Sequence, residues 1–277
     1  MQAVSDVPSI PPPPVAAPAG DHADMLHAAR RGVLLGLATL TVLLAPAIPM
    51  PDSGAGASHT PAPGAALTTP VPPPGPARFA DFGPQAPSAQ ARHVADWVAD
   101  SRDNGGAHFI VLDKQQATLY IFDAEARLRG ATPVLLGAAR GDDTVPGIGA
   151  RAIADVQPHE RTTPAGRFVA ERGRNTLGED VVWVDYDAAV SIHRLRETEP
   201  KERRLQRLAS KTIADNRVSY GCINVPVAFF EAVVQPAVAS RRTLVYVLPE
   251  DRSAQEVFGS YDVAALRRAQ RLLAQRS

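Results

Sequence analysis

The chain has 277 residues, of which 45% are apolar, and its basic and acidic side chains are equal in number, so the formal net charge is zero. This apolar content suffices for one domain with a sizeable core, whereas 26 prolines predict that part of the chain is irregular. The neutral balance argues against a nucleic-acid partner, because a nucleic-acid-binding protein needs a basic face.

The first 87 residues divide into three segments. Residues 1–29 are expected to be disordered and include a polyproline stretch. Residues 30–50 open with two arginines and continue as an uncharged apolar run, which predicts an uncleaved membrane anchor or a cleaved export signal. A buried soluble helix is the third interpretation. Residues 51–87 are rich in Pro, Ala and Gly and predict a semi-extended linker.

Both leading interpretations of residues 30–50 have the same consequence for the rest of the chain. An uncleaved anchor would tether the chain to a membrane, and a cleaved signal would release it. In either case the C-terminal part is exported, so we expect a location in the cell envelope or periplasm.

The folded domain is predicted at 88–250, with a C-terminal helix within 251–277. Ser88 is suited to cap a first helix. Apolar and β-branched runs between turn residues predict strands at 108–112, 118–122, 133–137, 168–170, 181–184, 189–193 and 243–248. Amphipathic spacing predicts helices at 89–100, 200–210, 226–234 and 263–275. Because strands dominate and come in runs, we expect a mainly β, mainly antiparallel domain with a few attached helices.

Cys222 is the only cysteine of the chain and lies in the segment Ser-Tyr-Gly-Cys-Ile-Asn-Val-Pro. In an exported chain a lone cysteine forms no internal disulfide, so it is either buried and inert or reactive. Its place just ahead of the helix predicted at 226–234 would favour a thiolate. Gly221 allows close approach of the backbone to a ligand, and the amides of residues 220–222 form a candidate oxyanion hole.

A thiolate nucleophile needs a base, and His193 is the best-placed histidine because it ends the apolar strand predicted at 189–193. A strand-end histidine is otherwise structural or merely exposed, and both interpretations stay open at this point. His159, His193 and Cys222 contain no close ligand pair such as Cys-x-x-Cys, so neither a metal nor another cofactor is predicted.

Three segments resemble the L,D-transpeptidases, which are also known as the YkuD-like catalytic domain. The residues from Ser219 to Pro226 are similar to the family's cysteine signature, and Ser191-Ile192-His193 to the strand that ends in its catalytic histidine. Residues 161–168 resemble its Thr-Pro-x-Gly-x-Phe turn. The resemblance covers about residues 105–250 and implies a β-sandwich-like catalytic domain that acts on peptidoglycan stem peptides.

The resemblance also implies roles for the residues around the thiol. Cys222 would be the nucleophile and His193 the base or the ion-pair partner of its thiolate. Gly221, together with the neighbouring amide of Tyr220, would hold the oxyanion. Ser219 would make hydrogen bonds within the loop.

Two further residues have more than one expected role. Asn224 would brace the loop, bind substrate or simply cap the next helix. Arg217 would meet a substrate carboxylate or remain a solvated surface side chain.

Two features depart from the family pattern. Tyr220 stands where the family usually has a second histidine, and tyrosine is no base near neutral pH. His193 and Cys222 are also farther apart in the sequence than is usual, because residues 194–218 include a mixed-charge helix. That helix is either solvated on the surface or a lid over the cleft.

The sequence therefore favours an envelope cysteine L,D-transpeptidase that crosslinks peptidoglycan stem peptides through a thioester on Cys222. With water as acceptor, the same site would be an L,D-carboxypeptidase. A non-catalytic peptidoglycan-binding module and a soluble cysteine hydrolase of other peptides are the remaining alternatives.

Overall fold

The computed structural model describes residues 76–277 except 198, 240–241 and 276–277, all within a compact unit that spans Ala65–Ser277. The segments at 1–29 and 30–50, and the linker as far as residue 75, lie outside the described residues. Within the described part, no helix combines the length and the apolar character that crossing a membrane requires.

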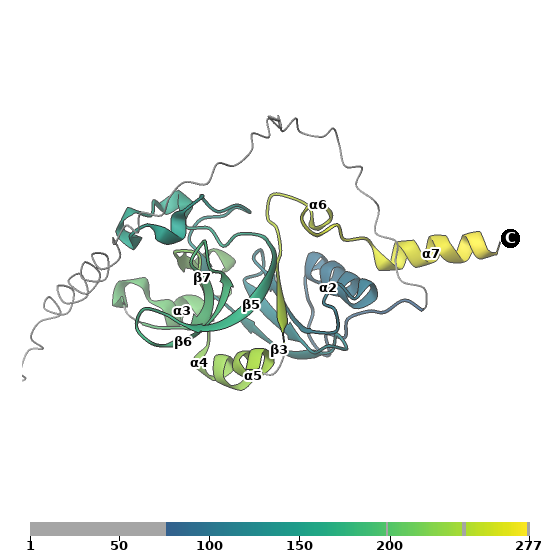
Figure 1. Cartoon of the computed structure of the whole chain (residues 1–277), viewed down its shortest axis with the longest axis horizontal. Coiled ribbons are helices and arrows are strands. Elements are labelled where there is room, and N and C mark those ends of the chain that lie inside the picture. The colour runs from purple at the N-terminus through teal and green to yellow at the C-terminus, as the bar shows by residue number, and fades with distance from the viewer. Residues whose placement is uncertain (1–75, 198, 240–241, 276–277) are drawn as a thin grey trace, which may run out of the picture. The chain divides into compact units, whose positions relative to one another are not determined.

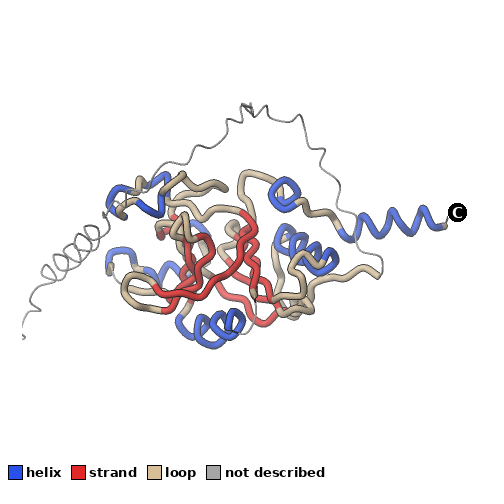
Figure 2. The backbone as a smooth tube through the Cα atoms, in the orientation of Figure 1, coloured by secondary structure: helices blue, strands red, loops and turns tan. Residues whose placement is uncertain are grey.

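Most of the described chain is built on one eight-stranded sheet in the order β3-β2-β1-β10-β5-β6-β7-β9. Figure 2 shows the strands in red, with helices and loops around them. Its strands are β1 His108–Asp113, β2 Thr118–Phe122, β3 Leu128–Pro133, β5 Gly166–Arg174, β6 Asp180–Asp185, β7 Val190–Arg194, β9 Ile223–Val225 and β10 Thr243–Val247. A small second sheet pairs β4, Leu136–Gly137, with β8, Arg217–Ser219. The expected mainly β domain with attached helices is confirmed. The sheet is mixed, however, because β1 and β10 run parallel, as do β7 and β9.

The eight-stranded sheet folds over on itself at β5. The first half of this long strand pairs with β10 and its second half with β6. Side chains from β1 and β2 and from β6, β7 and β9 therefore meet in one core, which includes Ile110, Val182 and Ile192. The chain just after β3 also reaches β9 at the other edge of the sheet, since Leu135 and Asn224 exchange two backbone hydrogen bonds of 3.0 and 2.9 Å. This closure satisfies backbone groups that an open edge would expose.

Helices cover the sheet on two sides (Figure 1). Ser88 caps α2, Ala89–Ser101, as expected, by accepting a hydrogen bond from the amide of Ala91. Side chains of α2 and α6 (Ala254–Phe258) pack on the outer face of β1, β2 and β10, and Val263, the first residue of α7 (Val263–Ala274), joins this core. A helical segment made of α4 (Val227–Phe229), a π-turn and α5 (Gln235–Ala239) contributes to the core between the two halves of the sheet.

Three sequence expectations need correction. The linker was expected to reach residue 87, but Ala80 and Phe82 are buried against the sheet, so the folded part begins earlier. The strand expected at 133–137 is divided between β3 and β4, because β3 begins at Leu128. The helix expected at 200–210 is shorter: a 3-10 turn, Pro200–Glu202, precedes α3, Arg204–Ala209.

A buried lysine joins three loops beside the folded sheet. The ammonium group of Lys114, which is 0% exposed, donates to the carbonyl oxygens of Gly141 (2.6 Å) and Thr163 (3.0 Å) and to Asp142 (3.1 Å). Glu250 lies 3.7 Å away. Burial lowers the pKa of Lys114, while its hydrogen bond to Asp142 and the two carboxylates oppose that shift.

The carboxylate of Asp142 accepts hydrogen bonds from backbone amides as well as from Lys114. Burial by itself would raise its pKa, but the backbone amides of residues 250–252 and the Lys114 ammonium bring the pKa to about 2. Because the folded-state pKa is depressed, the carboxylate stabilises the fold above its ordinary titration range. That contribution is lost as the pH falls towards about 2.

We expect Lys114→Met to lower the free energy of unfolding by about 3–5 kcal/mol, because it leaves buried carboxylates without their cation. Arg252→Met is the matched control. Arg252 also pairs with Asp142, but its side chain is 44% exposed, so we expect a loss of about 1 kcal/mol or less. Urea denaturation at neutral pH measures both values, and equal losses would contradict the role given to Lys114.

Candidate active site

The loop that carries the thiol lies between β8 and β9 and is closed by its own side chains. The hydroxyl of Ser219 donates to the carbonyl of Cys222 (2.6 Å) and accepts from the amide of Gly221 (3.2 Å). Thr163 reaches the loop from the Thr-Pro turn, donating to the carbonyl of Gly221 (2.8 Å) and accepting from the amide of Gly137 (3.0 Å). Ser219 thus bonds within the loop, as the sequence predicted. The amides of Tyr220 and Cys222 remain as oxyanion candidates.

Gly221 is required at its position for two reasons. Its φ of +130° is rare for residues with a side chain, and a Cβ there would lie 2.7 Å from the carbonyl oxygen of Thr162. The loop therefore packs against residues 162–163 without room for any side chain. This contact places Cys222 at the start of β9.

Parallel pairing of β7 and β9 brings Cys222 and His193 together. The register sets Ile192 opposite Ile223 and His193 opposite Asn224, so Cys222 follows on opposite Ser191, near the start of β7. The side chains of His193 and Cys222 lie close enough for each to shift the pKa of the other. Nδ1 of His193 is 2.9 Å from the carbonyl of Arg194, which assigns the proton to Nδ1 and leaves Nε2 for the sulfur.

The surroundings of the half-buried thiol favour its charged form. Burial alone would raise the pKa of Cys222, but the neighbouring imidazole of His193 and the hydrogen bonds from Ser191 lower it. Burial likewise acts to lower the pKa of His193, and the cysteine overcomes it, so the imidazole pKa is raised. The Sγ–H group also donates to the carbonyl of Ala189 (3.5 Å), a contact that suits only the neutral thiol.

The helix expected to activate the cysteine does not do so. Residues 223–225 form β9, and α4 begins only at Val227, so Cys222 is not at a helix N-terminus. The expectation from the helix dipole is wrong because a three-residue strand was overlooked. His193 and Ser191 lower the thiol pKa instead.

Asn224 lies in β9, two residues after Cys222, and is fully buried. Its amide donates to the carbonyl of Cys222 (3.3 Å), and its side-chain oxygen accepts from Arg204 (2.8 Å). It does not cap the next helix, where Pro226 is the capping residue. Of the roles expected for Asn224, the geometry matches the brace of the loop, and burial leaves no surface for a substrate.

Arg217 is neither solvated nor available to a substrate. Its side chain is 8% exposed and forms an ion pair with Glu250 (2.5 Å). Its guanidinium also donates to the carbonyls of Lys114 (3.0 Å) and Ala139 (3.3 Å). Arg217 therefore belongs to the buried charge cluster around Lys114, and we leave it out of the substrate site.

Tyr220 lies at the rim of the loop and is partly exposed. The guanidinium of Arg161 lies 4.0 Å from the centre of its ring, within the range of a cation–π interaction. Sequence reasoning singled out residues 161–168 only as a turn and missed this contact. The pair places a positive charge and an aromatic ring beside the nucleophile loop.

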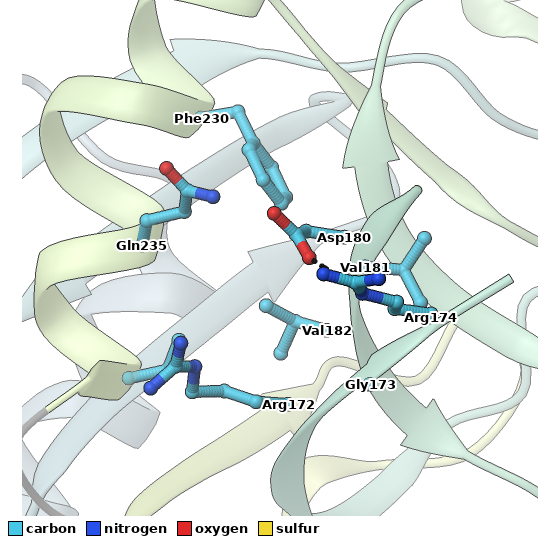
Figure 3. Close-up of a pocket in the computed structure, with 9 residues that line it drawn as sticks. Arg172, Gly173, Arg174, Asp180, Val181, Val182, Phe230 and Gln235 are labelled. Atoms are coloured by element: carbon cyan, nitrogen blue, oxygen red, sulfur yellow. Dashed lines mark ion pairs between the residues drawn. The ribbon is translucent and has the colours of Figure 1, made fainter. Parts of the chain in front are cut away.

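A hollow of about 330 Å³ lies elsewhere, between the β5–β6 hairpin and the helical segment at 227–239 (Figure 3). Its polar lining comes from Arg172, Arg174, Asp180 and Gln235, and Arg174 pairs with Asp180 at 3.5 Å. Neither Cys222 nor His193 lines this hollow. It is therefore distinct from the site around the thiol.

Comparisons with known proteins give distant structural similarity only. No family model and no curated protein matches the chain. Among solved structures, 16 chains match. One is the helical cell shape determining protein Pgp2 from Campylobacter jejuni, at 16% identity and a TM-score of 0.36, covering 53% of this chain and 49% of that one.

Two further matches are L,D-transpeptidases. LdtMt1 in complex with imipenem is 16% identical, with a TM-score of 0.31 and coverage of 51% of this chain and 59% of that one. The L,D-transpeptidase of Xylanimonas cellulosilytica is 13% identical, with a TM-score of 0.32 and coverage of 63% and 99%. The chain thus spans about half the length of the Pgp2 structure. TM-scores of this size carry no weight for activity, so the function has to come from the chain's own side chains.

We expect Gly221→Ala to slow alkylation of Cys222 and to lower stability by about 1–3 kcal/mol, because the loop must move away from Thr162. Gly178→Ala is the matched control: its φ is also positive, at +78°, but a Cβ there meets nothing within 4 Å. Iodoacetamide kinetics and urea unfolding measure the two effects. Slowed alkylation in both variants would show that backbone strain alone is responsible.

We expect His193→Ala to reduce the alkylation rate of Cys222 at pH 7 by about ten-fold or more, because the thiol pKa returns towards its ordinary range. The rate should recover as the pH is raised above that range, where thiolate forms without the imidazole. His93→Ala, in α2, is the control and should react like wild type. An unchanged rate in His193→Ala would exclude the ion pair.

Proposed function

We propose that the protein is a cysteine acyltransferase of the L,D-transpeptidase type that crosslinks peptidoglycan stem peptides in the cell envelope. The single observation that carries the proposal is the pair of His193 and Cys222, which the β7–β9 pairing brings together and in which the thiol pKa is lowered and the imidazole pKa is raised. A thiolate beside an imidazolium at neutral pH is the arrangement of an activated cysteine nucleophile.

In the first half-reaction the thiolate of Cys222 attacks the carbonyl carbon of a stem-peptide bond. The amides of Tyr220 and Cys222 would stabilise the negative charge that develops on the carbonyl oxygen. The carbon–nitrogen bond then breaks, and the leaving amine takes the proton from Nε2 of His193. The products are a released D-amino acid, a thioester on Cys222 and a neutral imidazole.

In the second half-reaction an amine from another stem attacks the thioester. Nε2 of His193 accepts the proton that the amine loses, and the carbon–sulfur bond breaks to restore the thiolate–imidazolium pair. The result is a new peptide crosslink. If water is the acceptor instead, the product is a trimmed stem, which is the carboxypeptidase alternative.

The choice of peptidoglycan as substrate is supported by several sequence features and not by the reactive pair itself. The segment 219–226 and the turn at 161–168 resemble the L,D-transpeptidases, and residues 30–50, with the Pro-rich stretch that follows them, resemble an export or anchor segment with a spacer. A peptidoglycan-binding module without activity is the second candidate. It is favoured by Tyr220, which replaces the family's second histidine, but such a module has no use for an activated thiol.

We expect residues 65–277, the compact unit, to form a thioester when mixed with a disaccharide-tetrapeptide stem. Intact mass spectrometry should show the acyl adduct on wild type and none on Cys222→Ala, with strongly reduced adduct on His193→Ala. Crosslinked dimers among the products support the transpeptidase, and trimmed tripeptide alone supports the carboxypeptidase.

The outcome that overturns the enzyme proposal is a folded wild-type protein that binds the stem but gives neither adduct nor product. Circular dichroism of each variant provides the folding control. Such a result would favour the peptidoglycan-binding module.

A further inference from the structure

Arg204 links the segment between His193 and Cys222 to Asn224, which lies beside the reactive pair. It is the first residue of α3, and its side chain is only 13% exposed. One guanidinium nitrogen donates to the side-chain oxygen of Asn224 at 2.8 Å, and Nε pairs with Glu202 at 2.6 Å. Helix α3 is therefore tied to the active-site loop by a directed contact.

The partners of Asn224 define which way its amide faces. A guanidinium only donates, so the group facing Arg204 must be the side-chain oxygen. A backbone carbonyl only accepts, so the group facing the carbonyl of Cys222 (3.3 Å) must be the NH₂. Because Asn224 is fully buried, loss of Arg204 would leave its oxygen without a donor.

Arg204 also acts on the imidazole through its charge. His193 and Asn224 are opposite each other in the β7–β9 pair, so the guanidinium that bonds Asn224 lies close to His193. The charged groups that act on the imidazole are Cys222, from the nucleophile loop, and Arg204, from α3. Glu202 partly neutralises the guanidinium from its other side.

We propose that Arg204 is a positioning residue that holds the Cys222 loop through Asn224 and makes the His193 imidazolium a readier proton donor. The expected effect on stem turnover rests on the proposed function. The contact between Arg204 and Asn224 does not depend on it. The mixed-charge helix within residues 194–218, expected to be solvated or a lid, is thereby assigned a third role, as a brace of the nucleophile loop. A nearby cation disfavours the imidazolium, so its removal should strengthen the hold of His193 on its proton.

The test compares three variants of residues 65–277. Arg204→Met keeps the apolar stem but removes donor and charge. Arg204→Lys keeps the charge. Arg207→Met is the matched control from the same helix, because among the described residues Arg207 donates hydrogen bonds only to the carbonyls of Glu202 (2.8 Å) and Asp215 (3.2 Å). Circular dichroism checks folding, and the iodoacetamide rate of Cys222 is recorded against pH.

Two apparent pKa values are expected from the alkylation profile, one for formation of the thiolate–imidazolium pair and one for loss of the imidazolium proton. In Arg204→Met the upper value should move to higher pH, and stem turnover should fall about ten-fold or more through misplacement of the loop. Arg204→Lys should keep the upper value near that of wild type. Arg207→Met should match wild type in both readouts.

Two results would overturn the proposal. The first is a folded Arg204→Met protein with the profile of wild type. The second is an equal shift in Arg207→Met, which would assign the effect to the segment as a whole. If wild type turns over no stem, the proposed function fails, and the alkylation profile still decides the role of Arg204.

Discussion

The position of the nucleophile depends on a buried positive charge. Lys114 sits in the turn between β1 and β2, where burial removes its ammonium from water, and its hydrogen bonds to Gly141, Asp142 and Thr163 compensate. Thr163 in turn donates to the carbonyl of Gly221. A charge at one end of the sheet thus determines where the segment around residues 139–165 lies, and that segment determines where the cysteine loop lies.

Closure of the sheet supplies the other half of the site. The bridge between Leu135 and Asn224 joins β9 to the residues between β3 and β4, and the parallel pairing with β7 sets His193 beside Asn224. The base therefore lies on β7, and the nucleophile is the loop residue directly before β9, the strand paired with β7. The backbone of Asn224 bonds to Leu135, and its side chain bonds to the carbonyl of Cys222. One residue therefore contributes both to the sheet and to the position of the nucleophile loop.

Elements with a strong local pattern were predicted well from the sequence: β1 and β2 from their apolar runs, and α2 from its serine cap. Cys222 and His193 were also singled out from the sequence as candidate nucleophile and base, because a lone cysteine and a strand-end histidine are conspicuous. Short β9 was missed, since three residues carry no periodicity, and with it the true origin of the lowered thiol pKa. The roles of Lys114, Arg204 and Phe82 depend on partners distant in sequence, which no local pattern reveals.

The solitary thiol has a consequence for redox chemistry. A thiolate with a lowered pKa is also the form of cysteine that peroxide oxidises, and the first product is a sulfenic acid. Proteins that tolerate this oxidation usually place a second cysteine nearby to trap the product as a disulfide. Cys222 has no such partner anywhere in the chain, so its recovery would depend on a thiol supplied from outside. The same arrangement that activates the sulfur leaves its repair to the reducing capacity of the surroundings.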